Sequence, residues 1–187
     1  MYETSDFRNG LKIEYEGQPY VIIEFQHVKP GKGNAFTRTR IKNLLTGRVL
    51  QPTLKSGERV GKPDIEDKTM TYLYAEGDAC AFMDIHNYEQ VTIPRENLGD
   101  QGAFLKENME CQVLFWNGRP INIDLPSHVN LKVTKTDPGF RGDTATNATK
   151  GATLETGAVV QVPLFINEGE TLRINTATGE YVERVNS

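Results

Sequence analysis

The sequence YVIIEFQHVKPGKGNAFTRTRIK occupies residues 20–42 and places a short glycine-rich loop between two strand-like runs. The runs cover residues 20–28 and 35–42, and two strands joined in this way predict a β-hairpin. Gly31 and Gly33 can adopt the positive φ that a tight hairpin tip needs. Pro30 cannot donate a backbone hydrogen bond, so we expect the end of the hairpin to project beyond its pairing partners.

The apex of this hairpin is Lys32, which has a glycine on either side. Its flexible stem therefore carries an ammonium group at the most exposed point of the hairpin. A glycine-lysine loop is also typical of an ordinary solvated turn, but loops on a rigid support often carry function. We predict Lys32 as a functional residue held by a tip loop of Pro30, Gly31, Gly33 and Asn34.

Positive charge follows the loop along the descending strand. Arg38, Arg40 and Lys42 alternate with other residues and so share one face of a strand. Together with Lys29 they form what we call the basic ridge, and Lys32 is its cationic tip. Such a ridge suits a polyanion such as RNA.

The composition describes a globular chain of 187 residues, with 37% hydrophobic and 25% charged residues. No apolar run approaches the roughly 20 residues of a membrane span, so we expect no membrane association. The polar start, Met1 to Gly10, is unlike a signal peptide. Cys80 and Cys111 are isolated in apolar runs, as reduced core cysteines are, and we expect a cytoplasmic protein.

Chemistry-bearing patterns are missing from the sequence. The three histidines have no metal-ligand spacing, and no Ser-His-Asp, Cys-His or two-His-carboxylate pattern stands out. The stretch from Gly57 to Lys62 lacks the spacing and the Ser or Thr of a phosphate-binding loop. We therefore expect no enzyme, no metal and no cofactor.

The net charge of −4 hides an uneven distribution. Residues 1–63 carry 11 Lys and Arg against 6 Asp and Glu, and residues 64–126 carry 4 against 12. Residues 127–187 carry 6 against 7. A basic first third and an acidic middle indicate polarised placement on a large partner.

Strand signals separated by turns fill the chain, with almost no helix, and predict an all-β fold. About five short strands in the first third favour a small barrel, because closure removes exposed edges. We place domains at residues 1–63, 64–126 and 127–187.

Several details of the second and third domains can also be predicted. In the second, Met70, Tyr72 and Tyr74 are expected on one face of a strand, Asn117-Gly118 is a type I′ turn signal, and Gly99 and Gly102 weaken a short helix within residues 95–107. In the third, residues 140–154 are expected to form a long polar loop. Pro163 implies an edge strand or a bulge.

Four motifs resemble bacterial elongation factor P. Residues 29–36 (KPGKGNAF) are similar to the tip of that family, and residues 136–145, with Thr136-Asp137-Pro138-Gly139 and Arg141-Gly142-Asp143-Thr144-Ala145, are similar to the first loop of its third domain. Residues 150–165 resemble the family signature, and residues 179–185 resemble its C-terminal end. The resemblance extends over the full chain.

This resemblance implies three consecutive β-barrels, an SH3-like (KOW-type) domain followed by two OB-folds, in an L-shaped outline like that of tRNA. It implies binding to the ribosome between the peptidyl and exit sites, beside peptidyl-tRNA, and relief of stalling at consecutive prolines. Lys32 would be the residue that a lysine-modifying enzyme extends toward the tRNA acceptor end. Ribosome or mRNA contacts of the third domain would come from Arg141, Gly142, Asp143, Thr144, Tyr181 and Arg184.

Two other classes stay open at this stage. One is an RNA-binding ribosome- or transcription-associated KOW/OB module without an effect on peptidyl transfer, which would bind RNA with no proline-specific effect. The other is an enzyme acting on RNA, which would need a carboxylate or metal cluster.

Overall fold

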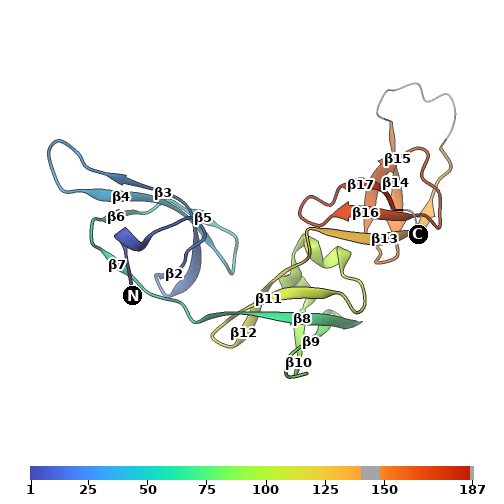
Figure 1. The fold of residues 1–187 in the computed structure, drawn as a ribbon, viewed down its shortest axis with the longest axis horizontal. Helices are drawn as coiled ribbons and strands as arrows, with labels where there is room; N and C mark the ends of the chain where they lie inside the picture. The colour runs from blue at the N-terminus through green and yellow to red at the C-terminus, as the bar shows by residue number, and fades with distance from the viewer. Residues whose placement is uncertain (140–147, 186–187) are drawn as a thin grey trace. The chain divides into compact units, whose positions relative to one another are not determined.

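A computed structural model of the chain describes residues 1–139 and 148–185. These residues form strands joined by turns and three short 3-10 helices, which confirms the all-β prediction. Contacts within the chain define two compact units (Figure 1). Unit 1 comprises residues 1–67 and 114–122, and unit 2 comprises residues 68–113 and 123–187. The predicted domain boundaries after residues 63 and 126 stay predictions.

The first barrel lies in unit 1 and is built around the predicted hairpin. Its elements are β1 (Tyr2–Glu3), η1 (Thr4–Asp6), β2 (Lys12–Tyr15), β3 (Gln18–Val28), β4 (Phe36–Asn43), β5 (Val49–Leu50), β6 (Thr53–Lys55) and β7 (Arg59–Val60). The sheet has the order β2-β3-β4-β5, and β6 also pairs with β4. A second, two-stranded sheet of β1 and β7 is linked to β2 by a bridge between Glu14 and Gly61.

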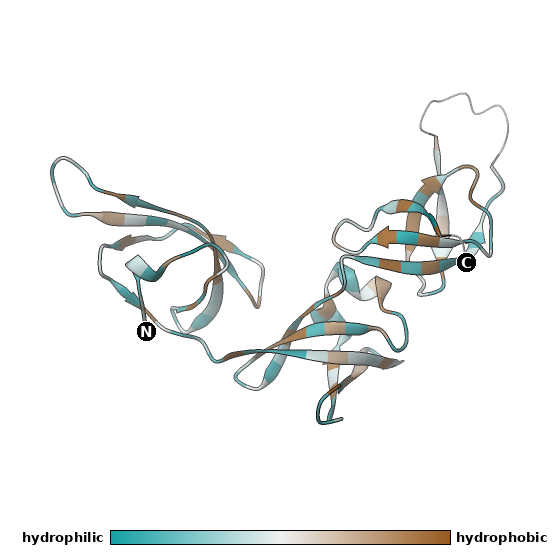
Figure 2. Cartoon of the chain, viewed as in Figure 1, coloured by the Kyte–Doolittle hydropathy of each residue, from teal (hydrophilic) through white to brown (hydrophobic). Residues whose placement is uncertain are grey.

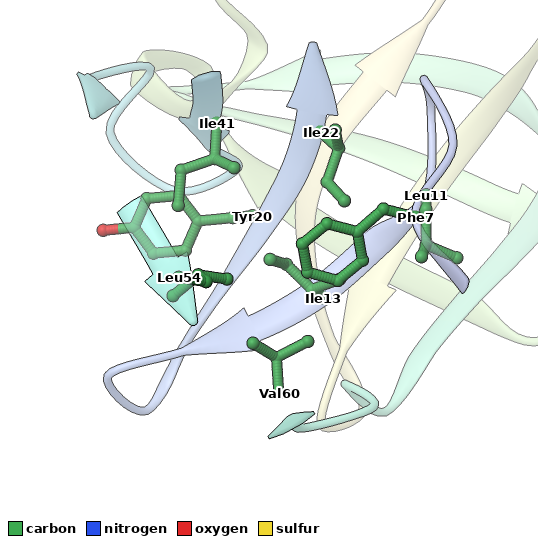
Figure 3. Packing of buried hydrophobic residues seen from close by; sticks show 8 residues of the cluster. All are labelled: Phe7, Leu11, Ile13, Tyr20, Ile22, Ile41, Leu54 and Val60. Carbon is green, nitrogen blue, oxygen red and sulfur yellow. The ribbon is translucent and has the colours of Figure 1, made fainter. Parts of the chain in front are cut away.

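A single apolar cluster fills this barrel (Figure 3). Ile13, Ile22 and Ile41 come from three successive strands and are each 1% exposed. The remaining members of the cluster are Phe7, Leu11, Tyr20, Leu54 and Val60. Because every second residue of a strand points inward, this core fixes which residues of β3 and β4 face solvent.

The middle sheet contains β8 (Ile65–Glu76), β9 (Ala79–Asp84), β10 (Gln90–Pro94), β11 (Glu110–Trp116) and β12 (Arg119–Asp124), in the order β10-β9-β8-β11-β12. Two short 3-10 helices, η2 (Arg95–Leu98) and η3 (Asp100–Phe104), stand where one short helix was expected. Gly99 separates them at a φ of 63°, a conformation that interrupts a helix.

The prediction for Tyr74 is wrong. The pairing of β8 with β9 shifts between Tyr72 and Tyr74, so that Tyr72 lies opposite Phe82 and Tyr74 opposite Ala81. An extra residue in one strand reverses the side that the following residues face. Tyr72 is accordingly 8% exposed and Tyr74 is 47% exposed.

The last sheet has the order β15-β14-β13-β16-β17, and its end strands β15 and β17 contact each other. Its strands are β13 (His128–Thr136), β14 (Thr149–Leu154), β15 (Val159–Pro163), β16 (Thr171–Asn175) and β17 (Tyr181–Val185). Hydrophobic and hydrophilic residues alternate along β13 and β16 (Figure 2). Pro163 ends the strand at one end of this order, as predicted. The expectation of a loop over residues 140–154 is wrong at its end, because residues 149–154 form β14.

Candidate functional site

The hairpin of β3 and β4 forms an arm, residues 23–40, that ends in the tip loop. The two strands pair from Tyr20 with Asn43 to Val28 with Phe36. Along the outer edge of β3, β2 pairs with residues 18–21 and the backbone of Gly10 and Leu11 bonds to Ile22, so the strand beyond Ile22 has β4 as its strand partner. On the other side of the hairpin, β6 pairs with residues 36–38 of β4. Figure 1 shows the loop at the end of the arm, beyond the other strands of this barrel. The projection predicted from Pro30 is therefore present.

In the tip loop, residues 29–35, the glycines on either side of Lys32 have open space beside them. Gly33 has a φ of 98°, whereas Gly31 is outside the left-handed region, so the expectation of positive φ holds for one of the two glycines. A Cβ on either glycine would meet nothing within 4 Å. Lys32 is exposed, and among the described residues it has no ion pair or hydrogen bond. Its ammonium group is free to contact a partner.

The basic ridge lies on the hairpin of β3 and β4. Arg38, Arg40 and Lys42 are exposed, and they alternate along β4 with the buried residues Thr37, Thr39, Ile41 and Asn43. The Arg38 guanidinium lies 5.5 Å from the centre of the Phe36 ring. Arg40 pairs with Glu24 at 3.9 Å, in a contact exposed on both sides. Lys29 is exposed at the start of the loop. The structure thus places all the predicted ridge cations on this hairpin.

Buried polar residues that sequence reasoning missed hold β4 in place. The Thr39 hydroxyl donates to the Pro52 carbonyl at 2.7 Å, and the Thr39 backbone N–H donates to the same oxygen at 3.1 Å. The Asn43 amide donates to Gln18 Oε1 at 2.6 Å, and its oxygen accepts from the backbone of Leu45 at 2.7 Å. These bonds satisfy buried polar groups and fix the strand that carries the ridge.

A hollow of about 690 Å³ opens at the root of the arm. Its lining residues are Asn9, Glu24, Phe25, Gln26, Arg38, Thr39, Arg40 and Gln51. Sequence reasoning found Arg38 and Arg40 but not the hollow. Asn9 and Gln51 come from connections far from the hairpin in sequence, and no local pattern links them to it.

Of the third-domain residues predicted from the resemblance, Tyr181 and Arg184 lie on β17. Tyr181 is half-buried opposite Ile174. The Arg184 guanidinium pairs with Glu170 at 3.1 Å and lies 4.9 Å from the centre of the Phe165 ring. Arg141, Gly142, Asp143 and Thr144 lie outside the described residues.

The chain on either side of residues 140–147 is mostly exposed, but it is held by close contacts and hydrogen bonds. A Cβ on Gly139 would lie 2.4 Å from the Leu164 carbonyl oxygen, a distance that no real side chain tolerates. The Thr136 hydroxyl donates to the Gly151 carbonyl at 2.9 Å, and the Lys150 ammonium donates to the Asp137 carbonyl. The two ends of the segment are thus joined across β13 and β14.

The perturbed titratable groups have structural causes. Backbone N–H groups of His86 and Asn87 hold the pKa of Asp84 below its usual value, and burial raises the pKa of the Cys111 thiol to about 12. Within residues 1–139 and 148–185, no cluster of His, Cys, Asp or Glu is arranged to hold a metal ion. The same part of the chain contains no helix that is long and apolar enough to span a membrane.

Comparison with known proteins gives matches along nearly the whole chain. Residues 3–60 match the elongation factor P KOW-like domain, residues 65–123 the elongation factor P OB domain, and residues 129–184 the elongation factor P C-terminal domain. Elongation factor P of Bdellovibrio bacteriovorus is 55% identical over 99% of this chain and 98% of its own length. That of Moorella thermoacetica is 53% identical over 98% of this chain and all of its own length.

Solved structures agree on the fold. The chain is similar to eukaryotic translation initiation factor 5A from Methanococcus jannaschii, with a TM-score of 0.54 and 22% identity, over 66% of this chain and 93% of the other. It is equally similar to a translation initiation factor 5A family protein from Naegleria fowleri, with a TM-score of 0.54 and 14% identity, over 66% and 94%. The matched domains and the curated relatives make this chain a translation factor, not an enzyme, and a member of the elongation factor P family.

Proposed function

We propose that this protein binds the ribosome beside peptidyl-tRNA, between the peptidyl and exit sites, and promotes peptide-bond formation at consecutive prolines. Its role is to hold the acceptor end of the tRNA in a reactive position. The observation that carries the proposal is Lys32, an exposed lysine that has no ion pair or hydrogen bond among the described residues and lies at the end of an arm with a basic face. Family membership supports the ribosome as the partner.

In this mechanism the protein supplies no acid, base or nucleophile. The proline nitrogen is held in a ring, and consecutive prolines make a stiff nascent chain that aligns poorly for reaction. Holding reactants in the right geometry removes a large entropic part of a barrier, so orientation alone can restore the rate. The ribosome carries out the chemistry.

The basic ridge binds the phosphate backbone of the tRNA in this mechanism. Arg38 and Lys42 are exposed, and neither has an ion pair among the described residues, so both can meet phosphates. Lys32, extended by a lysine-modifying enzyme, would reach the sugars and phosphates of the acceptor end. In the third domain, Tyr181 and Arg184 with residues 141–144 would contact the ribosome or mRNA.

The test is translation of a Pro-Pro-Pro reporter in a system depleted of this factor. Natively modified wild type should restore synthesis, and Lys32→Ala should not. Lys135→Ala is the matched control, because Lys135 is also an exposed lysine without a described ion pair. Full rescue by Lys32→Ala would exclude the role of Lys32. If wild type binds RNA but has no proline-specific effect, the KOW/OB module without an effect on peptidyl transfer is the better description.

A further inference from the structure

We propose that the hollow at the root of the arm is a subsite for a single unpaired nucleotide, with a preference for a base that bears an exocyclic amino group. This inference rests on the proposed function for its choice of RNA as the natural ligand. It goes further in assigning base recognition to a protein whose ridge, taken alone, would bind only the RNA backbone.

The hollow has the volume of a ligand site, and its lining is mainly polar and charged. Its volume of about 690 Å³ falls within the roughly 300–1,000 Å³ of small-molecule pockets. Four separate segments supply its lining: Glu24 to Gln26, Arg38 to Arg40, Asn9 and Gln51. The pair of Gln26 and Arg38 lies two residues from the last pair of the arm, about 7 Å along the strand. The hollow thus extends from Glu24 and Arg40, at the root of the arm, to within about 7 Å of the last strand pair before the tip loop.

Three primary amides line the hollow without partners of their own. Among the described residues, the side chains of Asn9, Gln26 and Gln51 have no hydrogen bond, whereas Gln18 and Asn43 of the same barrel bond to each other at 2.6 Å. An amide offers one acceptor and two donors in a plane, and Asn and Gln pair with base edges in this way. Three free amides around one hollow therefore favour a base over a bare phosphate.

Of the other lining residues, Arg38 suits the phosphate of a nucleotide. The Arg38 guanidinium lies over the Phe36 ring, where it keeps its donors for a phosphate. Phe25 also belongs to the lining, but its ring packs against the apolar core of the barrel and lies 5.4 Å from the ring of His27, so it supports the wall of the hollow. Thr39 takes no part in recognition, because its hydroxyl already donates to Pro52.

Glu24 supplies the selectivity. Its carboxylate only accepts hydrogen bonds, and Arg40 holds it at 3.9 Å within the lining. An amino group of cytosine or adenine can donate to it, as cytosine N4 does to Glu in nucleic-acid complexes. The carbonyl oxygen at the corresponding position of uracil would be repelled. The acceptor end of tRNA, CCA, consists only of amino-bearing bases.

The experiment uses the full chain, ¹⁵N-labelled, titrated with CMP and with UMP while the side-chain amide signals are followed. We expect the signals of Asn9, Gln26 and Gln51 to shift, with CMP binding about fivefold to tenfold tighter than UMP. Gln26→Ala should weaken CMP binding about fivefold. Gln90→Ala, which removes an exposed glutamine of β10, should change nothing. Equal affinity for the two nucleotides, or an unchanged affinity in Gln26→Ala, would overturn the subsite.

The variant Glu24→Gln tests the selectivity. The amide can donate as well as accept, so the ratio of CMP to UMP affinity should fall to near one, while a ratio that stays at its wild-type value would refute the role of Glu24. Competition between CMP and the trinucleotide CCA distinguishes the sources of the ligand. If CMP displaces bound CCA, a free mononucleotide is sufficient to occupy the subsite. If CCA displaces bound CMP but CMP does not displace CCA, the natural ligand is a nucleotide within an RNA strand.

The proline reporter keeps this inference separate from the proposed function. Wild type that rescues the reporter but shows no preference for CMP disproves the subsite and leaves the proposed function standing. A clear preference for CMP in a protein that fails to rescue the reporter disproves the proposed function and leaves the subsite standing.

Discussion

Gly33 and Gly31 flank Lys32 symmetrically in sequence but differ in backbone conformation. Gly33 has a φ of 98°, where a side chain is strained, and Gly31 does not adopt a left-handed φ. We expect Gly33→Ala to lower the free energy of unfolding by about 1 kcal/mol, because a Cβ in this region crowds the following carbonyl. Gly31→Ala should leave it unchanged. Urea unfolding of both variants is the measurement, and equal effects would contradict the assignment.

Burial of the Cys111 thiol makes the stability of the fold depend on pH in the alkaline range. Burial raises its pKa from 9.0 to about 12, so the folded chain keeps the thiol neutral where the unfolded chain ionises it. The resulting stability is complete below about pH 9 and is lost as the pH rises toward 12. We therefore expect Cys111→Ala to be less sensitive than wild type to a change from pH 8 to pH 10.5, as measured by urea unfolding. Parallel curves would show that the thiol ionises equally in both states.

At the scale of the element, Asp84 organises the turn between β9 and β10. Its carboxylate accepts from the backbone N–H of His86 at 2.8 Å and of Asn87 at 3.4 Å, which lowers its pKa from 3.8. Stability from this carboxylate is present above pH 3.8 and is lost as the pH falls through the lower folded-state pKa.

Asp84→Asn tests this turn, because the amide oxygen can accept the same two bonds without titrating. We expect the variant to lose less stability than wild type between pH 5 and pH 2.5, and Asp84→Ala to be destabilised at every pH because the N–H groups lose their acceptor. Thermal unfolding across this range measures both. A wild type and Asp84→Asn with the same acid dependence would exclude the carboxylate as the cause.

The elements that local sequence determines could be predicted. Asn117 and Gly118 have φ values of 50° and 76°, as a type I′ turn requires, and the strands around Lys32 begin and end within two residues of their expected bounds. The predicted orientation of Tyr74 was wrong because the bulge that turns this residue outward depends on the pairing of β8 with β9. β14 was missed because its residues are polar and small, and its pairing with β13 and β15 determines its conformation.

In the candidate site, too, the features set by local sequence could be predicted and those that depend on distant segments could not. The exposed face of Arg38, Arg40 and Lys42 follows from the two-residue period of a strand. The hollow does not, because it needs Asn9 and Gln51 to be brought beside the hairpin by the closure of the barrel. Positions within one hairpin could be predicted, and neighbours from separate connections required the fold.

At the scale of the whole molecule, the chain forms two compact units, and Phe104 is a buried residue of unit 2. It ends η3, is 7% exposed, and its ring lies 3.4 Å from where a Cβ on Gly179 would be. Nearby, Lys106 pairs with Glu155 at 3.2 Å. Unit 2 therefore joins the middle sheet to the last one.

Phe104→Ala should destabilise unit 2 by about 3–5 kcal/mol, because it removes a large buried ring and leaves a cavity. Hydrogen exchange should accelerate in β9, β16 and β17, while the strands of the first barrel keep their protection. Tyr88→Ala is the control, since Tyr88 is 71% exposed. Equal acceleration in both units would mean that the chain unfolds as one cooperative body.

The open surroundings of the tip loop also affect how the protein meets a protease. Exposed, weakly packed loops are preferred sites of cleavage, and trypsin cuts after lysine unless proline follows. Lys29 precedes Pro30 and is resistant, so the tip presents one susceptible bond, between Lys32 and Gly33. A group attached to the Lys32 ammonium would prevent trypsin from cleaving that bond. Brief digestion of the native protein therefore reports on a gel what fraction of the molecules carries a bare tip.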